Sequence, residues 1–311
     1  MTPLAHQEPG KAPSPLTLWL WAARPRTLPL AASAIMLGFG LSVMQGAARW
    51  GIFLLALVTA LLLQILSNLA NDYGDAVSGA DTPDRLGPRR MVGSGLTSPQ
   101  RMFRAVLLAA AMALVSGLGL VFAACWGNWP LLAFFMLLGA SCIAAAVLYT
   151  VGKRPYGYLG LGDFMAGLFF GPVAVWGSAV LCGAWQFAPL FLPGMAAGFC
   201  STMVLNVNNM RDIETDRRTG KMTVAARLGL ANATRYHLVL ALLVVLCWAG
   251  FWLLYRPGFL PALALALPLL ESVRRAVSRP RDAANLNAQL RNTVIGSAVC
   301  SAGMGLLCLL P

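Results

Sequence analysis

Two clusters of acidic and amide side chains interrupt long apolar stretches of this 311-residue chain. In the first cluster, Asn71 and Asp75 are four residues apart, so they share one face of a helix. In the second, Asn208, Asp212 and Asp216 follow one another at steps of four and line a second helix face. Asn71 precedes Asn208, and Asp75 precedes Asp212, by the same number of residues. This shared offset predicts two equivalent helices that face each other across a cavity.

Carboxylates in such positions predict a site for Mg²⁺. Unpaired acids at membrane depth cost several kcal/mol on most scales and are usually functional. A divalent cation removes that cost, and Mg²⁺ prefers carboxylates, water and phosphate oxygens. Solvated helix caps are the alternative interpretation. We expect Asp75 and Asp212 to be catalytic, together with Lys153 and Tyr149. The expected metal ligands are Asp72, Asp75, Asp81, Asp212 and Asp216, beside the substrate-binding amides Asn68, Asn71 and Asn208.

Basic side chains near these clusters predict a bound diphosphate. Tyr149 and Lys153 are four residues apart at the end of an apolar stretch and would face the same way on a helix. Lysine is a point-charge phosphate binder, and tyrosine donates one hydrogen bond. The alternative is a pair of anchors at the membrane interface. Arg211 and Lys221, close to the second cluster, are expected to assist in binding the diphosphate.

The elements that position these residues are predicted to be membrane-spanning helices. The chain is 58% hydrophobic and only 11% charged, against roughly 25% charged residues in soluble domains. Nine segments approach the roughly 20 apolar residues that a span requires: 27–48, 50–71, 103–125, 129–150, 161–181, 188–210, 236–255, 257–275 and 292–311. We therefore expect an all-α polytopic membrane protein. A single domain of nine transmembrane helices, residues 16–311, would follow a disordered, proline-rich tail, residues 1–15, that does not resemble a signal peptide.

Charge asymmetry predicts the orientation of this bundle. With the N-terminus in the cytoplasm, all of the 23 lysines and arginines except Arg49 and Arg256 fall on the cytoplasmic side. The eleven acidic residues fall there as well. The net charge of +12 therefore reflects membrane topology, and no nucleic-acid-binding motif accompanies it. The central cavity, with its chemistry, is expected to open to the cytoplasmic side.

These motifs resemble the UbiA superfamily of intramembrane aromatic prenyltransferases. The resemblance rests on the two acidic clusters, on Tyr149-x-x-x-Lys153, and on Arg24-Pro25-x-Thr27-Leu28-Pro29. Residues 71–88 and 208–221 are similar to the branch that acts on 1,4-dihydroxy-2-naphthoate. The 4-hydroxybenzoate branch carries a third acid four residues after the second, where this sequence has Gly79 and places the acid at Asp81.

The resemblance implies a reaction in the bacterial cytoplasmic (inner) membrane. A polyprenyl diphosphate, held by Mg²⁺ and Lys153, would ionise and prenylate 1,4-dihydroxy-2-naphthoate with loss of CO₂. The product would be demethylmenaquinol, a precursor of menaquinone. Arg24, or Arg85 on a long basic loop that could close as a lid, would bind the carboxylate of the acceptor.

This reaction has three alternatives. They are a prenyltransferase for another acceptor such as 4-hydroxybenzoate, a secondary transporter and a CDP-alcohol phosphotransferase. A transporter would place its acids nearer the membrane midplane, and the phosphotransferase signature Asp-Gly-x-x-Ala-Arg does not occur. The prenyl chain length and the oligomeric state are left open.

Overall fold

The computed structural model describes residues 14–81, 86–87 and 90–311, and the regular elements in these ranges are all helical. The predicted tail of residues 1–15 lies almost wholly outside the described residues. The elements are α1 Pro15–Ala23, η1 Pro25–Thr27, α2 Leu28–Met44, α3 Trp50–Val77, α4 Pro99–Cys125, α5 Trp129–Leu148, η2 Tyr156–Leu159, α6 Gly162–Leu168, η3 Phe169–Val173, α7 Ala174–Leu181, α8 Ala188–Arg218, α9 Val224–Tyr255, η4 Pro257–Ala266, α10 Leu267–Ser278 and α11 Ala283–Leu307.

The described residues confirm the predicted all-helical bundle, and their helices match the expected nine in outline. Among the described residues, 7 helical stretches are long and apolar enough to cross a membrane; the first joins α1 and α2, and the fifth joins α6, η3 and α7. The eighth predicted segment forms η4 and α10, and the ninth forms α11. Several helices are longer than the sequence predicts. α8 continues to Arg218 and α11 begins at Ala283, because polar residues near these ends lie inside the bundle, where they remain helical.

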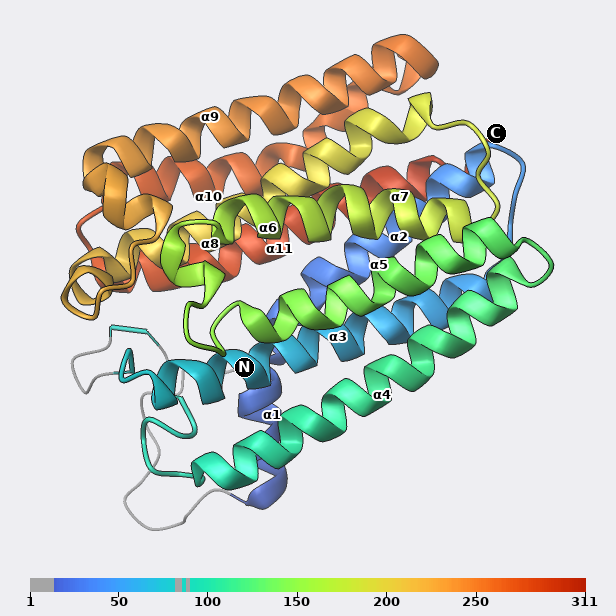
Figure 1. Cartoon of the computed structure of the whole chain (residues 1–311). Coiled ribbons are helices and arrows are strands. Elements are labelled where there is room, and N and C mark those ends of the chain that lie inside the picture. The colour runs from blue at the N-terminus through green and yellow to red at the C-terminus, as the bar shows by residue number, and fades with distance from the viewer. Residues whose placement is uncertain (1–13, 82–85, 88–89) are drawn as a thin grey trace.

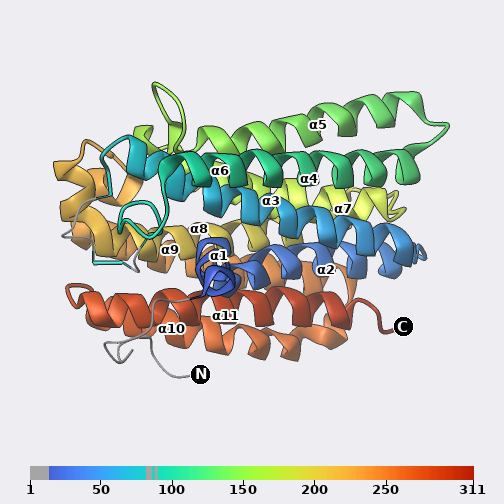
Figure 2. The same ribbon diagram turned by 90° about the horizontal axis from the view of Figure 1, so that it is seen from below.

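The chain turns sharply at Arg24, between α1 and the spanning helix α2. Arg24 adopts a left-handed conformation with φ 50°, and Pro25 follows it. A left-handed arginine costs roughly 1–2 kcal/mol, so the surrounding contacts must hold it in place. The turn leaves α1 lying across the bundle, while the other helices run roughly along its length (Figures 1 and 2). α1 exposes Leu16 and Leu20, as a helix at a membrane interface would.

The segment α6–η3–α7 crosses the bundle as one interrupted helix. Its centre is a π-helical turn that contains Pro172. Close packing on α8 requires glycine here, since a Cβ on Gly171 would lie 2.5 Å from the carbonyl oxygen of Gly194. α6–η3–α7 thus forms a wall fixed to α8.

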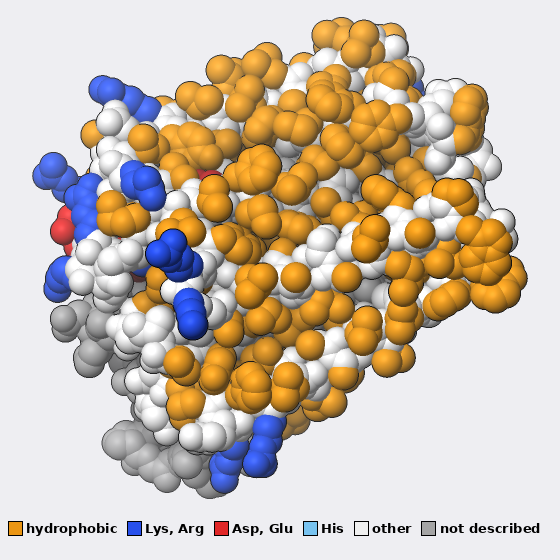
Figure 3. All heavy atoms as spheres, in the orientation of Figure 1, with side chains coloured by type: hydrophobic (Ala, Val, Ile, Leu, Met, Phe, Trp, Pro, Cys, Tyr) orange, Lys and Arg blue, Asp and Glu red, His pale blue; other side chains and the backbone are white. Residues whose placement is uncertain are grey.

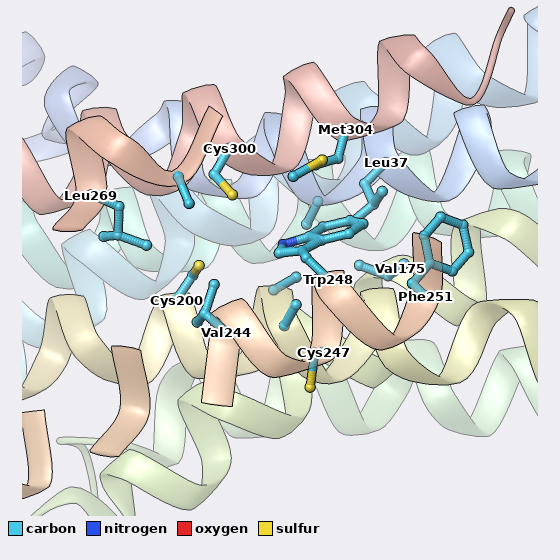
Figure 4. Close-up of a cluster of buried hydrophobic side chains, with 14 of the residues drawn as sticks. Leu37, Val175, Cys200, Val244, Cys247, Trp248, Phe251, Leu269, Cys300 and Met304 are labelled. Atoms are coloured by element: carbon cyan, nitrogen blue, oxygen red, sulfur yellow. The ribbon is translucent and has the colours of Figure 1, made fainter. Parts of the chain in front are cut away.

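A core of aromatic and sulfur-containing side chains joins α2, α8, α9 and α11. Trp248, Phe251 and Trp252 on α9 are fully buried, and Figure 4 shows the Trp248 ring beside Leu37 and Met304. The outer surface of the bundle is also apolar. Figure 3 shows hydrophobic side chains over most of one face, with lysine and arginine gathered at the end that carries the α8–α9 turn. This distribution fits a protein surrounded by lipid.

Candidate active site

A cavity of about 1600 Å³ lies between α2, α3, α5 and α6–η3–α7. Its wall on α3 extends from Ala56 to Asp75, which corresponds to roughly 28 Å along the helix axis. One end is polar and is lined by Asp75 and Lys221, among others, while the rest is mostly apolar. The cavity thus combines a charged end with a long apolar arm.

Asp75 lies at the polar end with partners from three other residues. Its side chain is buried, and Arg90 places Nη2 2.5 Å from Oδ2. Lys221 places Nζ 3.8 Å from the same oxygen, and the Tyr158 hydroxyl donates to Oδ1 at 2.7 Å. Burial, followed by the charge of Asp75, raises the pKa of Tyr158, so this phenol stays a hydrogen-bond donor. Two cations and one donor therefore stabilise a carboxylate that would otherwise be costly to bury.

Arg90 connects this acid to the rest of the first cluster. It donates from Nη1 to the carbonyl of Asn71 at 2.6 Å, and its Nε lies 3.9 Å from Oδ1 of Asp81. Burial lowers the pKa of Arg90, but Asp75 and Asp81 raise it further, and the net effect is an increase. Arg90 is therefore a permanent cation at the site. Arg90 is not among the residues predicted for the site, because nothing in the sequence of a basic loop indicates that a given arginine becomes buried.

Asp72 and Asn68 hold the chain around the site. The two carboxylate oxygens of Asp72 accept the N–H groups of Met91, at 2.9 Å, and Val92, at 3.0 Å. Asn68 donates to the carbonyl of Ala23 at 2.8 Å and thereby supports the turn at Arg24. Both side chains line the cavity, but these contacts give each of them a structural role.

The second cluster lies on α8 and is held by Arg211. This arginine contacts both carboxylate oxygens of Asp212, at 2.7 and 2.5 Å, and also donates to Asn208 at 2.9 Å and to Asn287 of α11 at 2.7 Å. Asp216 accepts a long hydrogen bond of 3.4 Å from Thr223. Each acid of this cluster is buried and held by a neighbouring side chain.

The expected pairing of Tyr149 with Lys153 on one helix face is wrong. α5 ends at Leu148, and Gly152, with φ 119°, follows in a non-helical turn. Tyr149 lines the cavity and packs edge-on against Tyr156, with ring centroids 5.4 Å apart. Lys153 is exposed and is not among the residues that line the cavity. Spacing of four residues places two side chains together only where the helix continues.

The predicted residues differ in their position relative to the cavity. Those that line the cavity are Arg24, Asn68, Asn71, Asp72, Asp75, Tyr149, Asn208 and Lys221. Those that are buried close to the polar end without lining the cavity are Asp212, Asp216 and Arg211. Asp81 lies beside Arg90 at the same end, and Arg85 lies outside the described residues.

Further basic and amide side chains line the polar end from α11 and η1. Arg291 and Asn287 come from α11, and Arg26 comes from η1 beside Arg24. Asn287 and Arg291 are four residues apart on one helix, so the same spacing rule could have identified them. The polar end of the cavity therefore carries several cations that suit the anionic groups of a ligand.

The acids would need help from a ligand to hold a metal ion. Within the described ranges, no three His, Cys, Asp or Glu side chains are grouped as a metal site. Mg²⁺, however, usually takes only one or two protein carboxylates and completes its shell with water and phosphate oxygens. Buried carboxylate oxygens on α3 and α8 are suitable metal ligands, and the cations at the same end of the cavity are suitable partners for a diphosphate. Together they fit a metal–diphosphate complex.

Comparisons with known proteins agree with this geometry. Residues 30–294 match the model of the UbiA prenyltransferase family. The chain is 46% identical over 280 residues to a 1,4-dihydroxy-2-naphthoate octaprenyltransferase of Escherichia coli, covering 90% of this chain and 91% of that protein. It is 38% identical to the protein of the same name from Mycobacterium tuberculosis, covering 90% and 93%. A UbiA homologue from Archaeoglobus fulgidus bound to GPP and Mg²⁺ shares the fold, with a TM-score of 0.67 and 17% identity over 94% of this chain and 99% of that one.

Proposed function

The chain belongs to the UbiA prenyltransferase family, and we propose that it transfers a polyprenyl group from polyprenyl diphosphate to 1,4-dihydroxy-2-naphthoate. The observation that carries the proposal is the cavity, in which Asp75 and Lys221 meet at the head of a long apolar arm. The charged end suits a diphosphate and the arm suits a prenyl tail. The names of the E. coli and M. tuberculosis relatives support the choice of acceptor.

The diphosphate of the donor would lie between the two acidic clusters. Mg²⁺, when bound, would neutralise its charge and stabilise it as a leaving group. Asp75 and Asp81 would hold metal from α3 and its following loop, and Asp212 and Asp216 would do so from α8, with small side-chain rotations away from Arg90 and Arg211. Mg²⁺ in the A. fulgidus homologue supports the choice of metal ion. Arg90 and Lys221, once released from Asp75, would be free to contact phosphate oxygens.

The reaction needs no base to remove a proton from the ring, because the prenylated carbon loses CO₂ instead. The bond between C1 of the prenyl group and oxygen breaks, and its electron pair leaves with the diphosphate. The naphthoate carbon that bears the carboxylate attacks the resulting allylic cation. The carboxylate then leaves as CO₂, and the electron pair of the broken C–C bond restores the aromatic ring. The apolar wall around the cation excludes water, which would otherwise capture it.

The carboxylate of the acceptor requires a cation near the charged end. Arg24 lines the cavity beside the first acidic cluster and is held there by the turn that Asn68 supports. We propose Arg24 for this role, assisted by Arg291 of α11, which also lines the cavity. A role for Arg85 in binding this carboxylate from a lid stays a proposal.

The membrane topology follows from the same charges. Lysine and arginine gather at the end of the bundle that carries the α8–α9 turn (Figure 3), and Lys221 of this turn pairs with Asp75. Under the positive-inside rule, this end faces the cytoplasm of a bacterial inner membrane, and the N-terminus lies on that side.

The test is product formation in membranes that contain the purified chain. Labelled octaprenyl diphosphate is supplied with 1,4-dihydroxy-2-naphthoate or with 4-hydroxybenzoate, with Mg²⁺ or with excess EDTA, and the lipid extract is analysed by mass spectrometry. We expect a decarboxylated prenyl naphthoquinol only with the naphthoate and Mg²⁺. Preferential prenylation of 4-hydroxybenzoate, or full activity in EDTA, would contradict the proposal.

A further inference from the structure

We propose that a groove between α9 and α10 binds one anionic phospholipid of the surrounding bilayer, with an acyl chain along the groove and the headgroup phosphate at Arg274. This surface is separate from the proposed active site, because the residues that line the groove do not line the large cavity. A failed test of the groove would therefore leave the proposed function intact.

The groove has a volume of about 480 Å³ and lies on the outside of the bundle. Leu238, Ala241, Leu242 and Val245 line it from α9, and their spacing puts them on one helix face. Ala241 is buried, whereas Leu238 and Leu242 are 46% and 57% exposed. This side of the groove is therefore an apolar wall that is open to lipid.

α10 supplies the opposite wall. Its apolar lining residues are Leu270, Val273 and Val277, which are buried or half-buried. Arg274 and Ser278 belong to the same helix face and also line the groove. The groove thus joins an apolar surface to a polar end that carries a cation.

The two helices run in opposite directions, which decides where this polar end lies. Ala233 of α9 shares a buried cluster with Ala276 of α10, and Val244 shares another with Leu269. Arg274 therefore lies toward the beginning of α9, at the end of the bundle where lysine and arginine gather (Figure 3). From there the groove continues into the apolar part of the bundle surface, as an acyl chain does below its headgroup.

Arg274 is suited to bind a phosphate. Its side chain is 70% exposed, and its Nε and Nη2 donate to Glu271 at 2.7 and 2.8 Å. Its Nη1 takes no part in this pair, and a guanidinium can bind a phosphate through such donors. Arg275 donates to the same carboxylate at 2.7 Å, so two arginines share one acid.

Other arginines add to the positive charge at this end of the groove. Residues 267–282 contain four arginines and two acids, and Arg279 and Arg281 in this segment are exposed. On α9, Arg235 is exposed three residues before Leu238, close to the same helix face. Clusters of basic residues beside a membrane attract anionic lipids.

The two ends of the groove select the class of lipid together. From Leu270 to Ser278, α10 rises roughly 12 Å, which is about the length of ten extended methylene groups with bonds of about 1.5 Å. The groove can therefore hold much of one acyl chain. A zwitterionic headgroup would bring its own cation beside the arginines, whereas an anionic headgroup would not. The charge of the site thus favours an anionic phospholipid.

The experiment compares two phospholipids with identical acyl chains. The purified full-length chain in detergent is titrated with phosphatidylglycerol or with phosphatidylcholine, and native mass spectrometry gives the Kd of the first bound lipid. We expect phosphatidylglycerol to bind at least tenfold more tightly, because its phosphate has no cation of its own. Equal Kd values for the two lipids would overturn the proposal.

A variant at the polar end shows where the headgroup is held, since the large cavity also carries cations. Arg274→Gln should weaken the binding of phosphatidylglycerol at least fivefold and leave that of phosphatidylcholine unchanged. The matched variant Arg101→Gln changes an exposed arginine in the first turn of α4 and should keep both Kd values. A wild-type Kd for phosphatidylglycerol in Arg274→Gln would show that the headgroup is bound elsewhere and would reject the site.

A variant in the apolar part shows where the acyl chain lies. Val245→Trp places an indole inside the groove and should weaken the binding of both lipids at least fivefold. Leu246→Trp adds the same ring to a neighbouring side chain that is 55% exposed and lies outside the groove, and it should keep both Kd values. Thermal unfolding in detergent confirms that each variant is folded before titration.

Two results of these measurements would contradict the assigned occupant. Unchanged lipid binding in Val245→Trp would mean that no acyl chain lies in the groove. A lipid-free dimer of the wild-type chain that Val245→Trp dissociates would mean that a second copy of the chain covers the groove instead.

Discussion

Lys221, which follows α8, places its ammonium group 3.8 Å from the carboxylate of Asp75 on α3. This ion pair joins the two halves of the site, since Asp75 belongs to the first acidic cluster and Lys221 follows the second in the sequence. Lys221 also lies over the ring of Tyr158, at 5.3 Å from the centroid. The charged end is therefore assembled from α3, the segment after α5 and the segment after α8, and its residues can be tested separately.

The acids of both clusters should be required for turnover. Asp75→Asn and Asp212→Asn each remove one negative charge and keep the side-chain volume, so we expect kcat to fall by more than 100-fold and Mg²⁺ dependence to weaken. Thermal unfolding in detergent should show that each variant still folds. Near-normal kcat in either variant would remove that acid from the proposed metal site.

Arg90 should matter for both stability and donor binding. Arg90→Gln leaves Asp75 with a weaker set of partners in a buried position, which should lower the melting temperature measurably. It also removes a cation that would contact the diphosphate. A lost charge-assisted hydrogen bond of roughly 1.5–3 kcal/mol corresponds to about 10- to 150-fold weaker donor binding. A matched variant, Arg154→Gln, changes an exposed arginine and should alter neither quantity. Equal donor KM values for the two variants would argue against a role for Arg90.

Lys221 and Lys153 can be compared directly. In this structure Lys221 lies at the charged end and Lys153 is exposed outside the cavity. We therefore expect Lys221→Ala to raise the KM for polyprenyl diphosphate about tenfold or more, and Lys153→Ala to have a smaller effect. A larger effect of Lys153→Ala would show that the segment after α5 moves over the bound donor and would restore the role first predicted for Lys153.

Arg24 should affect the acceptor rather than the donor. Arg24→Gln should raise the KM for 1,4-dihydroxy-2-naphthoate about 10- to 150-fold at saturating donor, since it removes one charge-assisted hydrogen bond. Arg291→Gln and Arg85→Gln are measured under the same conditions. They show whether Arg291 on α11 or Arg85 on the long loop also binds the acceptor carboxylate. Wild-type acceptor KM in Arg24→Gln would place the carboxylate elsewhere.

The sequence by itself determined the bundle and the two clusters. Runs of about 20 apolar residues and the uneven placement of lysine and arginine are local signals, and they predicted nine helices with the chemistry at one end. Steps of four residues also identified Asp75 and Asn208 correctly as neighbours of a cavity, because α3 and α8 continue as helices through these residues.

Tertiary structure decided which of these residues meet. Lys153 lies outside the site because α5 ends before it. Arg90 lies in the site because residues 90–92 are hydrogen-bonded to α3. Helical periodicity fixes only which side chains share a face of one helix. Which faces meet depends on packing between segments far apart in the chain, and spacing along the sequence does not contain that information.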